Sequence, residues 1–366
     1  MSAKVTDVND AMKANKAAAE RVLFESDGVP MPSPEQVAQA ARSKTFTESA
    51  PAIGDLLGPA LDIMRARADK SALPVSLPWK KTGEALGGGL WPGLHVLTGA
   101  TGQGKTQFAL QAAFHAAKGG TPVLYVGLEL GRVDIVARLL TLAAAEAGHA
   151  NGAVTKWSDL YNGRGGNLDA IEKAGASMLG ELPLFVEFGP PMGWDFNQLY
   201  ERVRGLREIY KEAEPGSKPL LVVLDYLQAV GSPPSDRMDL RERISRASYV
   251  GRAAARDFNA AVLMVSSVSR ANAMELRGKG EDDASEKGPS DFVGMGKESG
   301  DIEYAADTVL ALVTDGEWNG SRTPMKLAIA KMRAGVPAFC ELSFDGSTFS
   351  ESGAVAMPTG KAAWRK

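Results

Sequence analysis

The sequence predicts an α/β fold, in which a mostly parallel, twisted sheet carries helices on both faces. From about Ser76 onward, short apolar runs rich in leucine and β-branched residues alternate with helical patterns. Runs that stay apolar at successive positions are typical of strands buried on both faces, as in a parallel sheet covered by helices. One such run, within Gly93–Ala117, leads through a glycine-bearing turn into a helical pattern, which is the order of a phosphate-binding strand, loop and helix.

Residues 1–75 differ from the rest and predict a short helical N-terminal extension before a single α/β domain at 76–366. An Ala- and Lys-rich pattern predicts a helix at Asn9–Glu25, and the proline-containing segment after it breaks the chain because proline lacks a backbone N–H. A second helix is expected at Ala52–Ala68, with its apolar residues mostly on one face and a kink or restart at Gly58–Pro59. Such an amphipathic helix needs a partner surface, on its own chain or on a neighbouring subunit.

Helical patterns separate many of the strands expected in the α/β domain. The final segment alternates between apolar and polar residues and turns at Asp345–Gly346, which predicts a C-terminal β-hairpin. The strands expected from the apolar runs are, in chain order, Leu94–Thr98, Pro122–Leu128, Pro183–Phe188, Leu220–Leu224, Ala261–Ser266, Thr308–Val313 and Met325–Ala330.

Composition excludes several classes of protein. With 44% hydrophobic and 23% charged residues, the chain has the balance of a soluble globular protein, and no apolar run reaches the roughly 20 residues that a bilayer span needs. The single cysteine, Cys340, excludes an intramolecular disulfide and a multi-cysteine metal site, and we expect a cytoplasmic protein with no membrane partner. Because the net charge is -3, any contact with nucleic acid is expected to be local, in a groove or pore.

The glycine-bearing turn matches G-x-x-x-x-G-K-T, the P-loop motif. Its glycines allow backbone N–H groups to curl around phosphate oxygens, and the N-terminus of the following helix adds partial positive charge. Lys105 is expected to reach the β- and γ-phosphates, and the Thr106 hydroxyl to ligate Mg²⁺. The residues expected to bind the nucleotide here are Gly99, Ala100, Thr101, Gly102, Gln103, Gly104, Lys105 and Thr106.

Two acidic residues lie at the ends of other predicted strands. The apolar run in "LLVVLDYLQAV" ends at Asp225, which is expected to hold the Mg²⁺ of the nucleotide. Glu129 closes the strand that follows the P-loop helix, and two strands that end at the same sheet edge would place it in one crevice with Lys105. From spacing alone, Glu129 fits equally well a water-activating base and a capping carboxylate before the helix that starts near Val133.

Several segments, in this order and spacing, resemble the DnaB-like replicative helicases, a branch of the RecA-type motors. The likeness covers about residues 76–350. The P-loop is common to many families, whereas D-Y-L-Q after the strand that ends at Asp225 and E-S-G-x-I-E-x-x-A-D are specific. The matching segments are "GATGQGKT", "VLYVGLEL", "LVVLDYLQAV", "KESGDIEYAADTVLAL" and "KMRAG". The resemblance implies a RecA-like sheet, ATP with Mg²⁺, and a ring of identical subunits, expected to be a hexamer, around single-stranded DNA.

The resemblance also implies roles for individual residues. Glu129 matches the glutamate that activates the attacking water. Lys331 and Arg333 match a basic pair that enters the neighbouring subunit's ATP site, where a guanidinium stabilises charge on the γ-phosphoryl group. Without the resemblance, this pair would be interpreted as a solvated strand end, and the next segment as an ordinary polar loop. The residues that match a pore loop holding the DNA backbone are Lys297, Glu298 and Gly300.

The chain departs from the family pattern at several points. Ser267 stands where the family usually has a glutamine that senses the γ-phosphate, which puts the coupling between hydrolysis and DNA in doubt. Lys297 replaces an arginine, keeping the charge without the bidentate fork. The long, charged, glycine-rich segment between Arg270 and Lys297 is expected to be mobile without a ligand. Residues 1–75 are too few for the family's helical collar domain, although Ala52–Ala68 lies where its linker helix would.

Three functions are compatible with these observations. The first is an ATP-dependent DNA helicase with 5′ to 3′ polarity implied by the resemblance, of an accessory or mobile-element kind, working with a loader or another replication protein. The second is a RecA- or KaiC-like ATPase switch that oligomerises and recruits a partner without unwinding DNA, which the net acidity and Ser267 favour. A small-molecule phosphotransferase fits least, because no lid or acceptor site is evident.

Overall fold

The computed structural model describes residues 51–146, 156–164, 168–189, 194–211, 218–231, 237–268, 270–277, 287–295 and 300–356. The helix predicted at Asn9–Glu25 and the proline break after it lie outside these residues. Contacts divide the chain into two units, Met1–Arg65 and Ala66–Lys366. The division falls within a helix, and the predicted boundary at residue 75 stays a prediction.

Helix α4 (Ile53–Ala68) occupies the range predicted for the second helix of the extension. It runs through Pro59 as one helix, so the expected restart at Gly58–Pro59 does not occur. A proline inside a helix removes one backbone hydrogen bond but does not always end the helix, because the remaining bonds can continue past a kink. The exposed apolar side chains of this helix are Ile53, Leu56, Leu57, Leu61, Ile63 and Met64.

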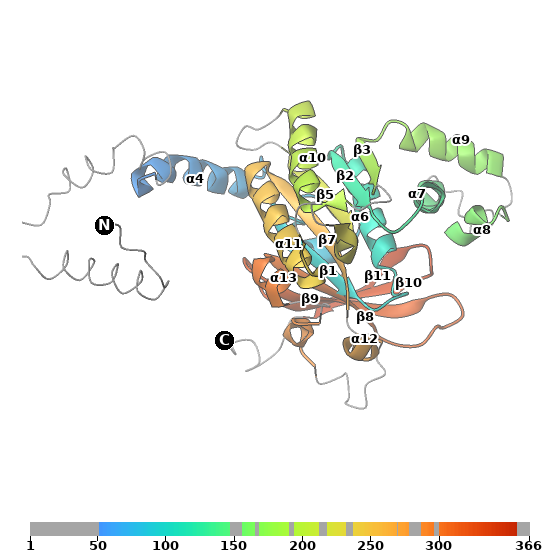
Figure 1. The fold of residues 1–366 in the computed structure, drawn as a ribbon. Helices are drawn as coiled ribbons and strands as arrows, with labels where there is room; N and C mark the ends of the chain where they lie inside the picture. Colours follow the sequence, from blue (N-terminus) through green and yellow to red (C-terminus); the bar gives the residue numbers. More distant parts are fainter. Residues whose placement is uncertain are drawn as a thin grey trace, which may run out of the picture. The chain divides into compact units, whose positions relative to one another are not determined.

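A nine-stranded sheet in the order β11-β10-β9-β8-β1-β7-β5-β2-β3 forms the centre of the second unit (Figure 1). The strands from β8 to β3 are all parallel to their neighbours. This is the parallel sheet predicted from the apolar runs, and the predicted α/β fold class is confirmed. The parallel strands are β1 (Gly93–Gly99), β2 (Val123–Gly127), β3 (Leu184–Phe188), β5 (Leu220–Asp225), β7 (Ala260–Ser267) and β8 (Thr308–Thr314).

The remaining strands of this sheet form an antiparallel extension at one side. β9 (Thr323–Met332) pairs with β8, β10 (Ala338–Phe344) pairs with β9, and β11 (Phe349–Ala356) pairs with β10. The predicted C-terminal hairpin is confirmed as β10 and β11, and it turns at Asp345–Thr348. A separate short sheet pairs β4 (Trp194–Asp195) with β6 (Val230–Gly231).

Helices cover both faces of the nine-stranded sheet and form two hydrophobic cores. One core takes buried residues from α6 and α7, and the other takes them from α10, α11 and α13. None of the described helices is long and apolar enough to cross a membrane. The helices of this unit are α5 (Lys80–Ala85), α6 (Lys105–Lys118), α7 (Arg132–Glu146), α8 (Trp157–Tyr161), α9 (Leu168–Leu179), α10 (Phe196–Ile209), α11 (Leu240–Asp257), α12 (Arg270–Leu276) and α13 (Gly300–Ala305), with 3₁₀ turns η1 (Leu227–Ala229) and η2 (Pro289–Phe292).

Strand β7 shows why the strands appear in the sequence as continuous apolar runs. Its alternate residues Leu263 and Val265 enter the core beneath α6 and α7, while Val262 and Met264 enter the core beneath α11. Successive side chains of a strand point to opposite faces, so a strand covered on both sides needs apolar residues at every position. In the segment predicted to be a mobile loop, helix α12 and the turn η2 are formed, because Leu276 and Phe292 are buried in the second core.

A glycine at the entrance to this unit gives a test of the fold. Gly89 has φ +148, and a Cβ there would lie 2.2 Å from the Val75 carbonyl oxygen. We expect Gly89→Ala to lower the free energy of unfolding by more than about 1 kcal/mol, because both the backbone conformation and the clash with a carbonyl oppose it. Gly205→Ala in α10 is the control: its Cβ would meet nothing within 4 Å, and we expect a gain of about 0.5–1 kcal/mol. Urea unfolding measures the stability of both variants. Equal midpoints would contradict the backbone conformation and the close contact described for Gly89.

Candidate nucleotide-binding site

The carboxyl ends of four neighbouring parallel strands meet at one edge of the sheet. Gly99 at the end of β1 pairs with Ser267 at the end of β7. Asp225 at the end of β5 pairs with Val265 of β7 on one side and with Gly127 of β2 on the other. The P-loop, Glu129 and Asp225 therefore follow β1, β2 and β5 of one parallel group, β1-β7-β5-β2, and open into one crevice. Such an edge is where ligands of open α/β sheets bind.

The P-loop turns from β1 into α6 through two glycines in the left-handed region. Gly102 has φ +87 and Gly104 has φ +82. Gly104 is also the N-cap of α6, and a Cβ on it would lie 2.9 Å from the Phe344 ring of the C-terminal hairpin. The loop therefore needs glycine for conformation and for space. Among the described residues, no side chain caps the N-terminus of α6, so its first backbone N–H groups are available to an anion in the crevice.

Lys105 lies at the first position of α6 with its side chain largely out of water. Its Nζ donates to the carbonyl oxygens of Gly99 at 2.8 Å and Ala100 at 3.1 Å. Burial lowers the pKa of Lys105, and the nearby carboxylates of Asp225 and Glu129 partly oppose that shift. The amine is therefore held by the loop's own backbone beside the two acidic residues.

Asp225 is a buried carboxylate, only 2% exposed, with two hydroxyl partners. The Tyr125 hydroxyl, on the neighbouring strand β2, donates to Asp225 Oδ2 at 2.7 Å, and the Thr106 side chain is also hydrogen-bonded to this carboxylate. Burial raises the pKa of Asp225, while both hydrogen bonds and the charge of Lys105 lower it. Burial and the same carboxylate raise the pKa of Tyr125, so its hydroxyl stays a donor.

The side-chain oxygens of Thr106 and Asp225 fit a magnesium ion that is bound together with phosphates. Thr106 and Asp225 offer hard oxygen ligands side by side, and Mg²⁺ is usually held by one or two such groups plus phosphate oxygens and water. Within the described part of the chain, no group of three or more His, Cys, Asp or Glu residues forms a metal site from protein alone.

A pocket of about 600 Å³ joins the predicted residues. The P-loop, Glu129, Asp225 and Ser267 all contribute to its wall, whereas Gly99, Ala100 and Gln103 do not. Several lining residues were not predicted, because aromatic and polar residues on separate helices and turns have no motif to mark them. The lining residues are Thr101, Gly102, Gly104, Lys105, Thr106, Gln107, Glu129, Leu130, Arg138, Trp157, Asp225, Tyr226, Val265, Ser267, Phe344 and Gly346.

Gln103 turns away from this pocket and is buried behind the P-loop. Its Oε1 accepts from the Ala100 N–H, and its Nε2 donates to the Leu276 carbonyl at 2.7 Å and to the Thr314 hydroxyl at 2.9 Å. Arg277 adds a hydrogen bond to the Thr101 carbonyl at 3.0 Å. The loop is thereby tied to the ends of α12 and β8.

Ser267 is held at the pocket wall by the glutamine of D-Y-L-Q. The Ser267 N–H donates to Gln228 Oε1 at 3.1 Å, and Gln228 Nε2 donates to the Ser266 hydroxyl at 2.8 Å. An amide side chain thus lies directly behind the position where the resemblance leads one to expect a glutamine.

Lys331 and Arg333 lie at the opposite edge of the sheet from the pocket. Lys331 pairs with Val309 at the start of β8, whereas Thr314 at the end of β8 contacts the P-loop through Gln103. β8 has 7 residues, which separate its two ends by about 20 Å at about 3.3 Å per residue. The basic pair is therefore too far away to act on a nucleotide held by its own P-loop.

Asp307, the last residue of E-S-G-x-I-E-x-x-A-D, fixes the backbone and side chain of Arg333. Its carbonyl accepts from the Arg333 N–H at 2.8 Å, and its Oδ1 lies 3.1 Å from Arg333 Nε. Its other oxygen accepts from the Leu94 N–H at 2.9 Å. Of the residues that match the pore loop, Gly300 begins α13, while Lys297 and Glu298 lie outside the described residues.

The buried carboxylate gives a pH-dependent prediction. Because burial raises the pKa of Asp225 above its ordinary 3.8, the folded protein binds this proton more tightly than the unfolded chain. The free energy of unfolding therefore falls as the pH rises from 3.8 through the raised pKa of Asp225. Above that pKa, the full cost of burying the charged carboxylate is present. We expect nucleotide-free Asp225→Asn, which keeps an acceptor for Tyr125 and Thr106, to be more stable than the unmodified protein at pH 7. Urea unfolding at several pH values should show that gain vanishing toward pH 3.8; a less stable variant at pH 7 would contradict it.

Comparisons with known proteins identify the family of this chain. Residues 81–351 match the family described as DnaB-like helicase C terminal domain. A probable replicative DNA helicase of Trieres chinensis is 27% identical over 269 residues, which are 69% of this chain and 51% of that protein. A replicative DNA helicase DnaB of Leifsonia xyli subsp. xyli is 26% identical over 300 residues, covering 78% of this chain and 58% of that protein. The chain thus spans little more than half of these relatives.

Solved structures share the fold. One, described as an ATPase domain, aligns with a TM-score of 0.60 at 20% identity, over 81% of this chain and 99% of that one. A DnaB-like replicative helicase, described together with its interactions with primase, aligns with a TM-score of 0.61 at 19% identity, over 94% of this chain and 76% of that one. With its P-loop, acidic residues and basic pair placed as described, and with the family match across most of its length, the chain belongs to the DnaB-like helicase C-terminal domain family.

Proposed function

We propose that this chain is the motor domain of an ATP-dependent DNA helicase, which hydrolyses ATP between the subunits of a ring. The observation that carries the proposal is the division of residues between two sheet edges. Lys105, Asp225 and Glu129 meet at the edge that holds the P-loop, whereas Lys331 and Arg333 lie at the other edge. Each chain would then supply the P-loop half of one ATP site and the basic half of the site in the neighbouring subunit.

At the P-loop edge, the chain's own residues bind the nucleotide and prepare water for attack. Backbone N–H groups at the start of α6 and the Lys105 amine hold the β- and γ-phosphates, with the lysine leaving its backbone acceptors. Thr106 and Asp225 would hold Mg²⁺, which would neutralise phosphate charge. Glu129, exposed in the pocket, accepts a proton from the water that attacks the γ-phosphorus, and ADP leaves.

Arg333 would complete the site of the next subunit. A guanidinium supplied in trans stabilises the negative charge that grows on the transferred phosphoryl group. Asp307 sets the direction of Arg333, and the side chain is 52% exposed and able to enter a neighbour. A closed ring, with six subunits as the resemblance implies, gives every site both halves.

Helix α4 supplies a second contact between subunits in this proposal. Its row of exposed leucine, isoleucine and methionine side chains is costly in water and would be covered by the motor domain of an adjacent subunit. Residues 1–75 would then act as a linker extension.

Single-stranded DNA would pass through the centre of the ring. The net charge of -3 leaves contact to a local loop, and Lys297, Glu298 and Gly300 would hold the DNA backbone without reading its sequence. The proposal also includes features that rest on the family resemblance alone. These are movement in the 5′ to 3′ direction, an accessory or mobile-element role, a cytoplasmic location and a loader or primase-like partner.

One observation favours a second function, an ATP-responsive switch that assembles and recruits a partner without unwinding. Ser267 has no amide to reach the γ-phosphate, and Gln228 behind it is engaged by Ser266 and Ser267. A site without that link could hydrolyse ATP independently of DNA.

The two functions differ in their response to DNA. For the motor, we expect single-stranded DNA to stimulate ATP hydrolysis and a forked duplex to be unwound, with both activities lost in Lys105→Ala. Glu129→Gln should keep ATP binding and slow hydrolysis by at least about 100-fold, because it removes the general base. Glu146→Gln, at the end of α7 and paired with Lys118 outside the pocket, is the matched control and should behave like the unmodified protein. The same rate of ATP hydrolysis with and without single-stranded DNA, together with no strand displacement, would rule out the motor and favour the switch.

A further inference from the structure

We propose that Gln103 and helix α12 couple nucleotide binding at the P-loop to Met295, which precedes the residues proposed to hold DNA. This inference rests on the proposed function, and it names the residues through which the two ligands would affect each other's binding. Gln103 lies inside the phosphate-binding motif but outside the wall of the pocket. It is therefore placed to respond to the loop without touching the nucleotide.

The Gln103 amide is buried, 6% exposed, and both hydrogens of its Nε2 are used. Nε2 donates to the carbonyl of Leu276, the last residue of α12, at 2.7 Å and to the Thr314 hydroxyl at 2.9 Å. Its Oε1 accepts from the Ala100 N–H. Because breaking the hydrogen bonds of a buried amide is unfavourable, a shift of the P-loop at Ala100 favours a matching shift at the end of α12.

Lys105 and Gln103 hold the same stretch of P-loop backbone. Lys105 Nζ donates to the carbonyl oxygens of Gly99 and Ala100, while the Ala100 N–H donates to Gln103. A Cβ on Gly99 would lie 3.2 Å from Lys105 Cγ and 3.3 Å from Gln103 Oε1, so both side chains pack closely on this backbone. In the proposed function, Lys105 leaves these carbonyls to hold phosphates. That step removes two hydrogen bonds from the backbone that Gln103 contacts, which gives the loop two arrangements.

Helix α12 is connected to the nucleotide pocket at both of its ends. Ser267 lines the pocket and precedes Arg270, the first residue of α12, by three positions. Arg277, directly after α12, donates to the Thr101 carbonyl of the P-loop at 3.0 Å. Leu276 is fully buried in the second core. A short helix that is fixed in this way moves together with the loop to which it is bonded.

Asn272 makes the next contact along this route. Its Nδ2 donates to the Met295 carbonyl at 3.0 Å. Met295 is 5% exposed and belongs to the same core as Leu276. The proposed DNA contacts begin two positions later, at Lys297. The route from Ala100 to Met295 thus consists of side-chain hydrogen bonds and one short helix, which is a physical connection between the two proposed binding sites.

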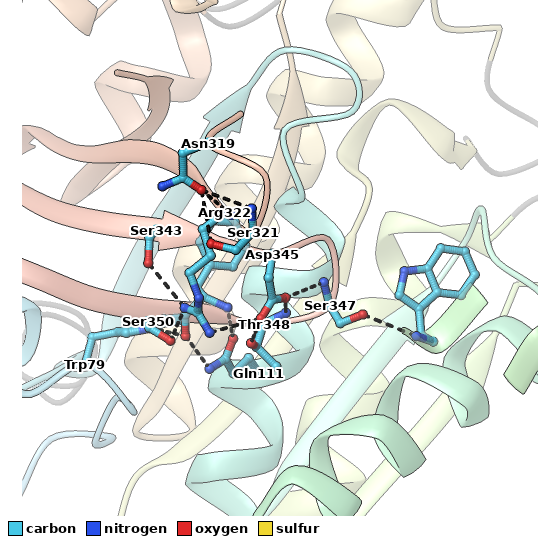
Figure 2. Close-up of polar contacts among 12 residues, drawn as sticks. Trp79, Gln111, Asn319, Ser321, Arg322, Ser343, Asp345, Ser347, Thr348 and Ser350 are labelled. Carbon is cyan, nitrogen blue, oxygen red and sulfur yellow. Dashed lines mark hydrogen bonds and ion pairs between the residues drawn. The ribbon is translucent and has the colours of Figure 1, made fainter. Parts of the chain in front are cut away.

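A second glutamine connects the P-loop helix to a different element, the β10–β11 hairpin (Figure 2). Gln111 of α6 donates to the Phe349 carbonyl at 2.9 Å and accepts from the Phe349 N–H at 2.8 Å. The turn of this hairpin is held by Asp345, whose Oδ1 accepts from the N–H groups of Ser347 and Thr348 (Figure 2). Gln111 therefore resembles Gln103 in bonding to backbone, but it leads to the hairpin instead of α12.

The test measures how strongly each ligand changes the affinity of the other. The affinity for adenylyl imidodiphosphate with Mg²⁺, a non-hydrolysable ATP analogue, is measured with and without oligothymidylate, and the affinity for oligothymidylate with and without the analogue. We expect the same factor in both directions, at least about fivefold in the unmodified protein. Gln103→Met, which keeps the side-chain length and removes its hydrogen bonds, should reduce both factors below about twofold.

Asn272→Leu should reduce the factors in the same way while keeping the DNA-free rate of hydrolysis, because it breaks the route beyond the P-loop. Combining it with Gln103→Met should add no further loss, since one shared route is already broken. Arg277→Met, at an exposed position, is the second variant at the P-loop end of α12 and should lower the factors even if Gln103→Met does not fold.

Gln111→Met is the matched control and should keep the full factors. Unchanged factors in Asn272→Leu and in Gln103→Met or Arg277→Met, or an equal loss in Gln111→Met, overturn the inference while the proposed function stands. Independent binding of the two ligands in the unmodified protein also overturns it. If DNA then fails to stimulate ATP hydrolysis as well, the proposed motor function falls with it.

Discussion

The structure depends on one constraint, the parallel pairing of β1, β7, β5 and β2 between two layers of helices. Parallel strands end at the same edge, so residues from four distant parts of the sequence arrive there together: Gly99, Ser267, Asp225 and, just past β2, Glu129. The helices that make this pairing possible bury both faces of the sheet, and α6, which packs in one of the two cores, also turns its N-terminus to that edge. Core packing and ligand binding are therefore set by the same elements.

The same edge concentrates charge that is unfavourable without a ligand. Asp225 is buried next to Lys105, and each group has its pKa shifted toward the neutral form by burial. Two donors on Gln107 and Arg138, without partners among the described residues, lie on the adjoining wall. A site of this kind lowers folding stability, and the proposed nucleotide would bring the charge and the hydrogen-bond acceptors that these groups lack. The antiparallel extension contributes to both edges of the sheet. The β10–β11 hairpin places Phe344 and Gly346 in the pocket wall, and the end of β9 places Lys331 and Arg333 at the opposite edge.

Most of the fold could be predicted from the sequence, because strands covered on both faces need apolar residues at most positions, and β5 and β7 follow this pattern. Lys105, Thr106, Glu129 and Asp225 could be located because a short motif or a strand end marks them. Tyr125, Arg138 and Trp157 could not, since their importance arises only when β2, α7 and α8 meet other segments in space. Gln103 lies inside a recognised motif yet turns behind the loop, which spacing alone does not reveal. Helix α12 was missed because a charged, glycine-rich neighbourhood masks the buried Leu276.

The central claim is that one chain supplies the P-loop and Glu129 of a site while the next supplies Arg333. Mixing two inactive variants tests this most directly. Glu129→Gln retains Arg333, and Arg333→Ala retains Glu129, so a mixed ring contains interfaces at which both groups are intact. We expect each variant alone to hydrolyse ATP negligibly and the mixture to recover a substantial fraction of the normal rate, rising and then falling as the ratio of subunits is varied. No recovery at any ratio, from two variants that assemble together, or normal hydrolysis by Arg333→Ala alone, would contradict a site shared between subunits.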